Sequence, residues 1–224
     1  MACGELDDPW TGRTPFLVAH RFGNEIARGR RADGRVSAIV EADLRLHGDE
    51  VEVRHARRLG RLPVLFDRWS LRRSRGGTPL LRDLLRSPAA ESGLLLDLKG
   101  SNERLAELVA AAIPGYDRTI AICARSWPLL RRFESLPVRR VASIGTLRQL
   151  EMFVDGAGVR TVDAVSVHEK LLTSRTVTGL RGVTDTILSW PVNAPARAAE
   201  LMHLGVRGLI TDDPPAVAAL VGDR

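Results

Sequence analysis

The chain has 224 residues, of which 44% are hydrophobic, so it can bury one sizeable core and we expect one domain over residues 16–224 behind an N-terminal extension, 1–15. Charged residues make up 27%, and no run approaches the ~18 apolar residues of a membrane helix. The chain begins with polar and acidic residues rather than a basic region and an apolar stretch, so we expect a cytoplasmic protein. Its two cysteines, Cys3 and Cys123, provide neither a disulfide framework nor metal-ligand spacing.

The net charge of +6 raises nucleic acid and anionic membranes as partners. The only lysines are Lys99 and Lys170, so most of the positive charge is arginine spread along the chain. The exception is the arginine-rich stretch Arg54–Arg75, which either meets an anionic ligand or membrane surface or is a solvated face. Nucleic-acid binding is not expected, because this stretch lacks a motif and shows no aromatic stacking pattern beyond Trp69.

In chain order, short apolar runs alternate with segments whose leucines and alanines recur at helical spacing, a pattern typical of βαβ units with a parallel sheet. The predicted strands are Phe16–His20, Ala38–Leu46, Gly93–Lys99, Thr119–Cys123, Arg139–Ile144, Val162–His168, Asp185–Val192 and Gly208–Thr211. The predicted helices are Pro79–Arg86, Asn102–Ile113, Pro128–Glu134, Thr146–Asp155, Ala194–Leu204 and Pro214–Val221. Eight strands predict a short (β/α)8 TIM barrel, although an open doubly wound sheet has similar periodicity.

Two segments depart from this regular pattern. Leu171–Val183 is poorly patterned and is predicted as loop with a short helix. Gly48–Gly77 is predicted as a small insertion after the second strand, with a short extra strand over Glu50–His55 and arginine- and glycine-rich loop beyond it. In a barrel, an insertion at this point lies at the active end, where the carboxyl ends of the strands carry the catalytic groups.

Glu41 and Asp43 alternate along the second predicted strand, so both project from one face. Burying two ionised carboxylates costs several kcal/mol each unless a cation or a hydrogen-bond network compensates. A hard divalent cation such as Mg²⁺ or Ca²⁺ prefers oxygen ligands of this kind. The alternative is that they lie at an exposed strand end and pair with Arg45 or another arginine.

The third predicted strand repeats the pattern, with Asp97 and Lys99 on one face of a leucine run. A private ion pair between the two is the simplest interpretation. However, this chain uses arginine almost everywhere else, so a lysine here is unusual. A compact ammonium beside carboxylates and a metal suits the binding of a phosphate oxygen.

Two histidines could supply a general base and a general acid, because imidazole exchanges a proton near neutral pH. His20 closes the first strand, and His55 closes the extra strand after the second. Either one alone is more often a structural group. Of the others, His168 is expected at the barrel mouth, whereas His47 and His203 are expected to be structural.

Taken in order, six motifs resemble the signature of the glycerophosphodiester phosphodiesterase family. They are Val18-Ala-His-Arg21, Glu41-Ala-Asp43, His55, Leu96-Asp-Leu-Lys99, and a C-terminal pair formed by Ser189-Trp-Pro-Val-Asn193 and Gly205–Asp212. Cys123-Ala-Arg-Ser126 lies where the family commonly has a serine opening the next helix. The resemblance spans roughly residues 16–221, and the ordered set is what makes it specific.

The resemblance implies hydrolysis of glycerophosphodiesters to sn-glycerol 3-phosphate and an alcohol, with a lysophospholipid as a further substrate type. It assigns acid/base catalysis to His20 and His55. The implied ligands of a divalent metal, Mg²⁺ or Ca²⁺, are Glu41, Asp43 and Asp97. The implied phosphate and substrate contacts are Arg21, Lys99 and Trp190.

The chain departs from the family pattern at four points. Phe22 replaces a glycine and is expected to narrow the mouth, and the Pro-Glu-Asn-Thr segment is reduced to Asn24-Glu25. Asp97 replaces a glutamate, and Ala56 replaces an aspartate that could orient the imidazole of His55. The alternative function is therefore a weakly active or inactive barrel that binds an anionic ligand, a membrane surface or a partner through Arg54–Arg75.

Overall fold

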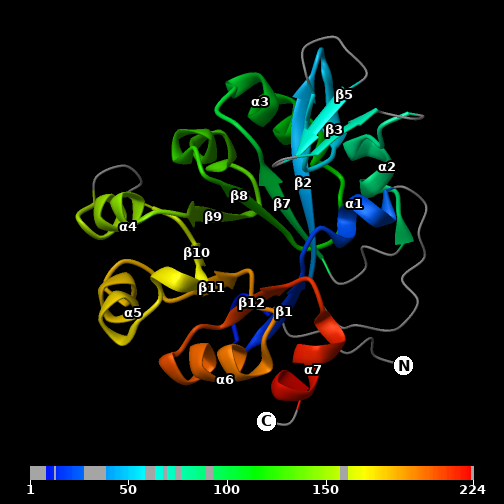
Figure 1. Ribbon diagram of the computed structural model, residues 1–224. Helices are drawn as coiled ribbons and strands as arrows, with labels where there is room; N and C mark the ends of the chain where they lie inside the picture. The colour runs from blue at the N-terminus through cyan, green and yellow to red at the C-terminus, as the bar shows by residue number, and fades with distance from the viewer. Residues whose placement is uncertain are drawn as a thin grey trace, which may run out of the picture.

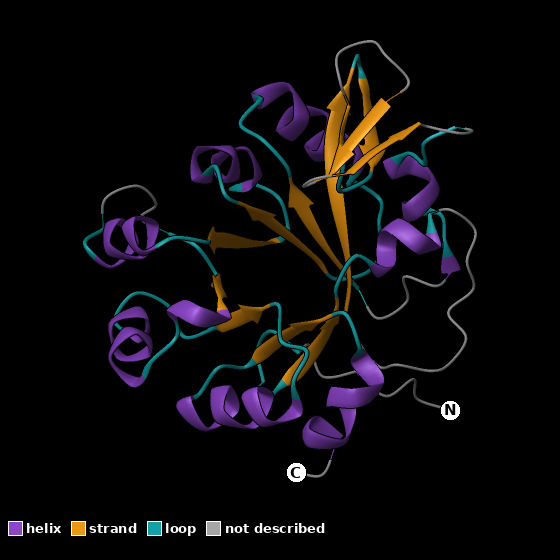
Figure 2. Ribbon diagram, viewed as in Figure 1, coloured by secondary structure: helices purple, strands orange, loops and turns teal. Residues whose placement is uncertain are grey.

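The computed structural model describes residues 9–12, 14–27, 39–58, 64–67, 70–73, 77–88, 93–156 and 161–222. Eight parallel strands form a ring with helices around its outside (Figures 1 and 2). In ring order they are β1 (Phe16–Ala19), β12 (Gly208–Thr211), β11 (Ile187–Trp190), β10 (Ala164–His168), β9 (Arg139–Ile144), β8 (Ile120–Ala124), β7 (Leu94–Leu98) and β2 (Ile39–His47). The predicted strands correspond to these eight.

Pairing of the first two strands closes the ring. Val18 is in register with Ile39 and Ala19 with Val40, so β1 has neighbours on both sides, β12 and β2. The sheet is therefore a closed barrel. The prediction of a (β/α)8 barrel is confirmed, and the open doubly wound alternative is wrong.

Helices connect successive strands and cover the outer face of the barrel (Figure 2). They are α1 (Phe22–Ile26), α2 (Leu81–Leu85), α3 (Glu103–Ala112), the 3-10 helix η2 (Trp127–Phe133), α4 (Leu147–Val154), the 3-10 turn η3 (Glu169–Leu171), α5 (Ser174–Arg181), α6 (Pro195–Leu204) and α7 (Pro214–Gly222). The poorly patterned segment after β10 contains α5, which Thr173 caps by accepting a hydrogen bond from the backbone N–H of Thr176. None of the helices in the described part of the chain is long and apolar enough to cross a membrane.

The insertion after β2 holds more strand than predicted. β2 turns back into β3 (Glu50–Val53), as expected from the alternation there. Beyond it, β4 (Arg57–Arg58), β5 (Val64–Asp67) and β6 (Ser70–Arg73) form a separate antiparallel sheet in a segment predicted as loop. The prediction failed because two-residue and four-residue strands rich in arginine carry little apolar alternation.

The barrel interior is filled by small and branched residues from every strand. Trp10 packs at the amino end of this interior against Phe16, with ring centroids 5.2 Å apart. The inward-facing residues beyond it are Val18, Ile39, Leu95, Ala121, Cys123, Val141, Ala164, Leu188 and Ile210. Because side chains alternate along a strand, the next inward positions of β2 and β7 toward the carboxyl ends carry Glu41, Asp43 and Asp97.

Candidate active site

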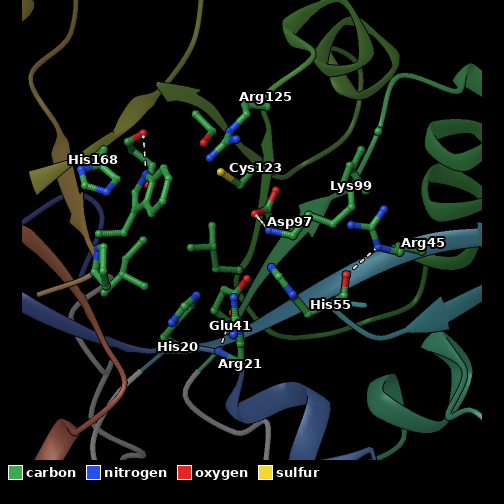
Figure 3. A pocket seen from close by; sticks show the side chains of 18 of the residues that line it. His20, Arg21, Glu41, Arg45, His55, Asp97, Lys99, Cys123, Arg125 and His168 are labelled. Carbon is green, nitrogen blue, oxygen red and sulfur yellow. Dashed lines mark hydrogen bonds and ion pairs between the residues drawn. The ribbon is translucent and has the colours of Figure 1, made fainter. Parts of the chain in front are cut away.

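A pocket of about 530 Å³ opens at the carboxyl ends of the barrel strands. Seven of the eight predicted site residues line it, namely His20, Arg21, Glu41, His55, Asp97, Lys99 and Trp190 (Figure 3). The eighth, Asp43, is fully buried beside them. The structure thus brings together residues from β1, β2, β7, β11 and the segment after β3, as predicted from strand order.

The three carboxylates converge. Glu41, Asp43 and Asp97 each offer an oxygen that lies within 4.8 Å of the others. Asn24 of α1 holds the Asp43 carboxylate through its Nδ2, 2.8 Å from Oδ2, while its Oδ1 accepts the backbone N–H of Asp43 at 3.0 Å. Glu41 accepts the backbone N–H of Arg21 at 2.5 Å. The remnant Asn24-Glu25 of the missing motif therefore supplies a buried amide that orients Asp43.

Lys99 lies among these carboxylates. Its Nζ is 2.7 Å from Asp43 Oδ1 and also contacts Asp97, so the simple interpretation of a private pair with Asp97 is wrong. Burial disfavours the ammonium, but the charges of Asp97 and Asp43 outweigh it and raise the pKa of Lys99. The same ammonium outweighs burial at Asp43 and lowers the pKa of that carboxyl. Arg21 is a more distant second cation, with Nε 3.7 Å from Asp43.

The carboxylate cluster is suited to a divalent cation. Burial and the neighbouring charge of Asp43 raise the pKa of Glu41 well above its ordinary value. The described side chains therefore place too little positive charge near Glu41 to offset these two effects. Three oxygen donors at this spacing are ligands that Mg²⁺ and Ca²⁺ prefer. Asp97, one methylene shorter than glutamate, is close enough to belong to the group. Glu41, Asp43 and Asp97 therefore fit the metal that the sequence implied.

His20 is oriented by residues at the ends of neighbouring barrel strands. Its Nδ1 lies 2.7 Å from Oδ1 of Asp212, just after β12. Asn193, beyond β11, holds Asp212 by donating from Nδ2 at 2.8 Å and accepting its backbone N–H at 2.9 Å. Burial lowers the pKa of His20, while the hydrogen bond to Asp212 acts in the opposite direction. The imidazole thus presents Nε2 to the pocket.

His55 has an equivalent carboxylate from an unexpected source. Its Nδ1 lies 3.0 Å from Oδ1 of Asp67, the last residue of β5. Burial lowers the pKa of His55, and the carboxylate of Asp43 opposes this. The expectation that Ala56 removes the group that could orient this imidazole is therefore corrected, because Asp67 of the inserted sheet reaches the ring.

Arginine and aromatic side chains form the rest of the wall. The Arg125 guanidinium carbon lies 5.2 Å from the centre of the Trp190 ring. His168, which was expected at the mouth, contacts the same indole edge-on with centroids 4.9 Å apart. Arg45 donates from Nε to the carbonyl oxygen of His55 at 2.8 Å, and none of the described carboxylates lies within ion-pair distance of it. The alternative of an exposed strand end paired with Arg45 is therefore wrong, because Glu41 and Asp43 are buried and the arginine that reaches Asp43 is Arg21.

Two further expectations are corrected by packing. Phe22 packs against the hydrophobic core from α1 and is not among the residues that line the pocket, so it does not narrow the mouth. Arg54 is only 3% exposed and pairs with buried Glu52, which also accepts from Arg58 at 2.7 Å. Arg54 is thus part of the interior rather than a ligand-binding face. Arg61, Arg68 and Arg75 of the same stretch lie outside the described residues.

Sequence reasoning did not assign roles to four polar residues of the site. Asn193 and Asp212 are the last residues of two matched motifs, and Asn24 belongs to the remnant of another. Their positions next to predicted strands were the signal that the sequence offered for these residues. Asp67 had no such signal. Its contact with His55 depends on the pairing of β4 with β5, which no spacing in the sequence indicates.

No protein-family profile matches this sequence, and no curated protein matches it either. Solved structures do. A glycerophosphodiester phosphodiesterase from Parabacteroides distasonis superposes with a TM-score of 0.70 at 18% identity, covering 94% of this chain and 98% of that one. A glycerophosphodiester phosphodiesterase from Thermotoga maritima gives 0.67 at 18% identity over 92% and 98%.

A third similar structure is an Oleispira antarctica phosphodiesterase in complex with its product sn-glycerol-3-phosphate, with a TM-score of 0.67 at 15% identity over 92% and 96% of the two chains. All three matches cover nearly the whole of both proteins. The chain therefore shares the (β/α)8 barrel fold of these phosphodiesterases, at 15–18% sequence identity.

Proposed function

We propose that this protein is a metal-dependent phosphodiesterase that hydrolyses glycerophosphodiesters to sn-glycerol 3-phosphate and an alcohol. One observation carries the proposal: two histidines, each with a carboxylate at Nδ1, share a pocket with a cluster of three carboxylates. In Figure 3, His20 and His55 lie on either side of Glu41. The barrel shared with solved phosphodiesterases, one of them holding sn-glycerol-3-phosphate, supports the same chemistry.

The histidines are suited to proton transfer on both sides of a phosphorus atom. A carboxylate at Nδ1 fixes the ring and its tautomer, leaving Nε2 for the substrate. One imidazole takes the proton of the attacking hydroxyl, and the other gives a proton to the oxygen of the departing alcohol. With water as nucleophile the products are a monoester and an alcohol, so the proton gained by one histidine balances the proton lost by the other.

Lys99 and Arg21 would hold the phosphate oxygens. The raised pKa of Lys99 keeps its ammonium charged at any pH at which the enzyme works. A divalent cation bound by Glu41, Asp43 and Asp97, which we propose to be Mg²⁺ or Ca²⁺, would stabilise negative charge on the same oxygens as a Lewis acid. Trp190 would contact the organic part of the substrate with its ring, which is fixed by donation from Nε1 to the carbonyl oxygen of Ser166 at 3.2 Å.

Hydrolysis of glycerophosphocholine, glycerophosphoglycerol and an aryl phosphodiester, measured with Mg²⁺ or Ca²⁺ and with EDTA, tests this proposal. We expect EDTA to abolish turnover and Glu41→Gln to lower kcat/KM by about 100-fold or more, in the range of a lost metal or acid/base group. Glu151→Gln is the matched control, since Glu151 is exposed on α4.

Metal binding should be followed separately by calorimetry, where Glu41→Gln weakens Mg²⁺ or Ca²⁺ affinity and Glu151→Gln does not. If the folded protein binds no divalent cation and hydrolyses none of the diesters, the proposal fails. An anion-binding barrel without catalysis would then be the remaining function.

A further inference from the structure

The cations of the pocket fall into two groups. Lys99 and Arg21 lie against the carboxylate cluster and are balanced by it. Arg45, Arg57 and Arg125 also line the pocket, yet none of the described acidic residues forms an ion pair with any of them. Guanidinium groups that share a cavity without such an acidic partner repel one another. Burial lowers the pKa of Arg45, and the charges of Arg54 and Arg57 lower it further.

Arg125 is an exposed residue of the pocket wall, and its head group lies against an aromatic ring. Its guanidinium stacks over Trp190, and the indole is itself held by Ser166 and by the edge-on contact with His168. Gly145 leaves room for it, because a Cβ at that position would come within 3.0 Å of an Arg125 nitrogen. None of the described residues accepts a hydrogen bond from this guanidinium, so its N–H donors are available to a ligand beside Trp190.

Arg125 also lies away from the groups assigned to the scissile phosphate. It follows β8, and Figure 3 shows it beyond Cys123 and Asp97 from His20, whereas Arg45 belongs to β2 beside His55. A glycerophosphodiester with one negative charge at the carboxylate cluster would leave this guanidinium without an anion. The glycerol half of such a diester carries only hydroxyl groups, so a further anion can come only from the alcohol half.

We propose that the alcohol released by this enzyme carries a second anionic group, phosphate or carboxylate, and that Arg125 binds it as a specificity-determining residue. The proposal rests on the phosphodiesterase function above and narrows its substrate class. Arg45 and Arg57 contribute positive potential on the other side of the pocket, which favours entry of a multiply charged diester over a zwitterionic one.

A matched pair of ligands tests this inference: glycerophosphoglycerol, and the same compound with a terminal phosphate on one glycerol. Calorimetry in EDTA measures binding without turnover, and kcat/KM with Mg²⁺ or Ca²⁺ then measures use as substrates. We expect the wild type to favour the phosphorylated compound by about tenfold or more in both measurements, the effect of a charge-assisted bidentate contact.

Arg125→Gln should reduce that preference at least several-fold, with Arg125→Lys intermediate because it keeps the charge but not the planar fork. Arg181→Gln is the control for net charge, since Arg181 is exposed at the end of α5 and does not line the pocket. Equal affinity of the wild type for both compounds, or an unchanged preference in Arg125→Gln, overturns the inference. The absence of metal-dependent hydrolysis of either compound, by contrast, overturns the proposed function, and the binding preference in EDTA is still measured.

Discussion

The two histidines of the pocket are positioned by different parts of the molecule. His20, Asp212 and Asn193 follow three strands of the barrel, β1, β12 and β11, which are neighbours in the ring. The pairing of Ala19 with Thr211 fixes the distance between the first two. His55 instead follows β3, outside the ring, and its partner Asp67 comes from the separate sheet β4–β6.

This difference indicates which of the two histidine positions can change while the barrel is kept. The register of a closed barrel cannot shift locally, so the geometry at His20 is tied to the whole sheet. The geometry at His55 depends on the insertion after β2. The pairing of the short strands β4 and β5 sets the position of its partner, Asp67. The side chain of His20 is 16% exposed and that of His55 28%, in keeping with a less enclosed second position.

Removal of either imidazole is the strongest test of whether both positions serve one reaction. We expect His20→Gln and His55→Gln each to lower kcat/KM by about 100-fold or more, the usual contribution of a general acid or base. His203→Gln is the matched control, because His203 lies exposed on α6. Steady-state kinetics on glycerophosphoglycerol with Mg²⁺ or Ca²⁺ gives the comparison.

A large loss at only one of the two histidines would contradict the paired acid/base mechanism. Thermal unfolding of each variant separates chemistry from folding. Both side chains are partly exposed and line the pocket rather than the hydrophobic core, so we expect little change in Tm. A fall in Tm large enough to unfold the variant at the assay temperature would make that histidine structural, and the corresponding half of the mechanism would be wrong.

Removing the carboxylates behind the histidines should have a smaller effect. We expect Asp212→Asn and Asp67→Asn to lower kcat by about tenfold or more, as for loss of one charged hydrogen bond, while KM changes little. Asp117→Asn is the control, since Asp117 is 88% exposed. Normal turnover in Asp67→Asn with reduced turnover in Asp212→Asn would show that the inserted sheet does not position His55.

The barrel was predictable because its strands are continuous apolar runs. A strand such as Leu94–Leu98 is buried on both faces, so its composition is enough to identify it. The inserted sheet was not predictable for the converse reason. β5 and β6 have four residues each, and β5 is partly exposed, so their pairing depends on contacts that leave no periodic pattern in the sequence.

The candidate site divides in the same way. The convergence of Glu41, Asp43 and Asp97 follows from side-chain alternation on two strands, β2 and β7, that the barrel order makes neighbours. The contact of Asp67 with His55 depends instead on the inserted sheet, and the stacking of Arg125 on Trp190 depends on the orientation of a residue just beyond β8. Orientation of a side chain on a loop is decided by its tertiary neighbours, which a sequence by itself does not place.

The finest distinction between the two histidines is in their response to pH. Burial lowers the pKa of His20, and Asp212 is the largest influence that raises it again. Asp212→Asn therefore lowers that pKa further, so the neutral ring persists to lower pH. If His20 is the base, the acid limb of the plot of log kcat/KM against pH shifts to lower pH. If His20 is the acid, the alkaline limb shifts to lower pH instead.

At His55 the influence of Asp67 on the pKa ranks behind those of Asp43 and Arg21, so Asp67→Asn should shift the limb that His55 controls by less. Profiles of the two variants and the wild type between about pH 5 and 9 decide this. Unchanged limbs in Asp212→Asn would mean that the titration of His20 does not control the rate.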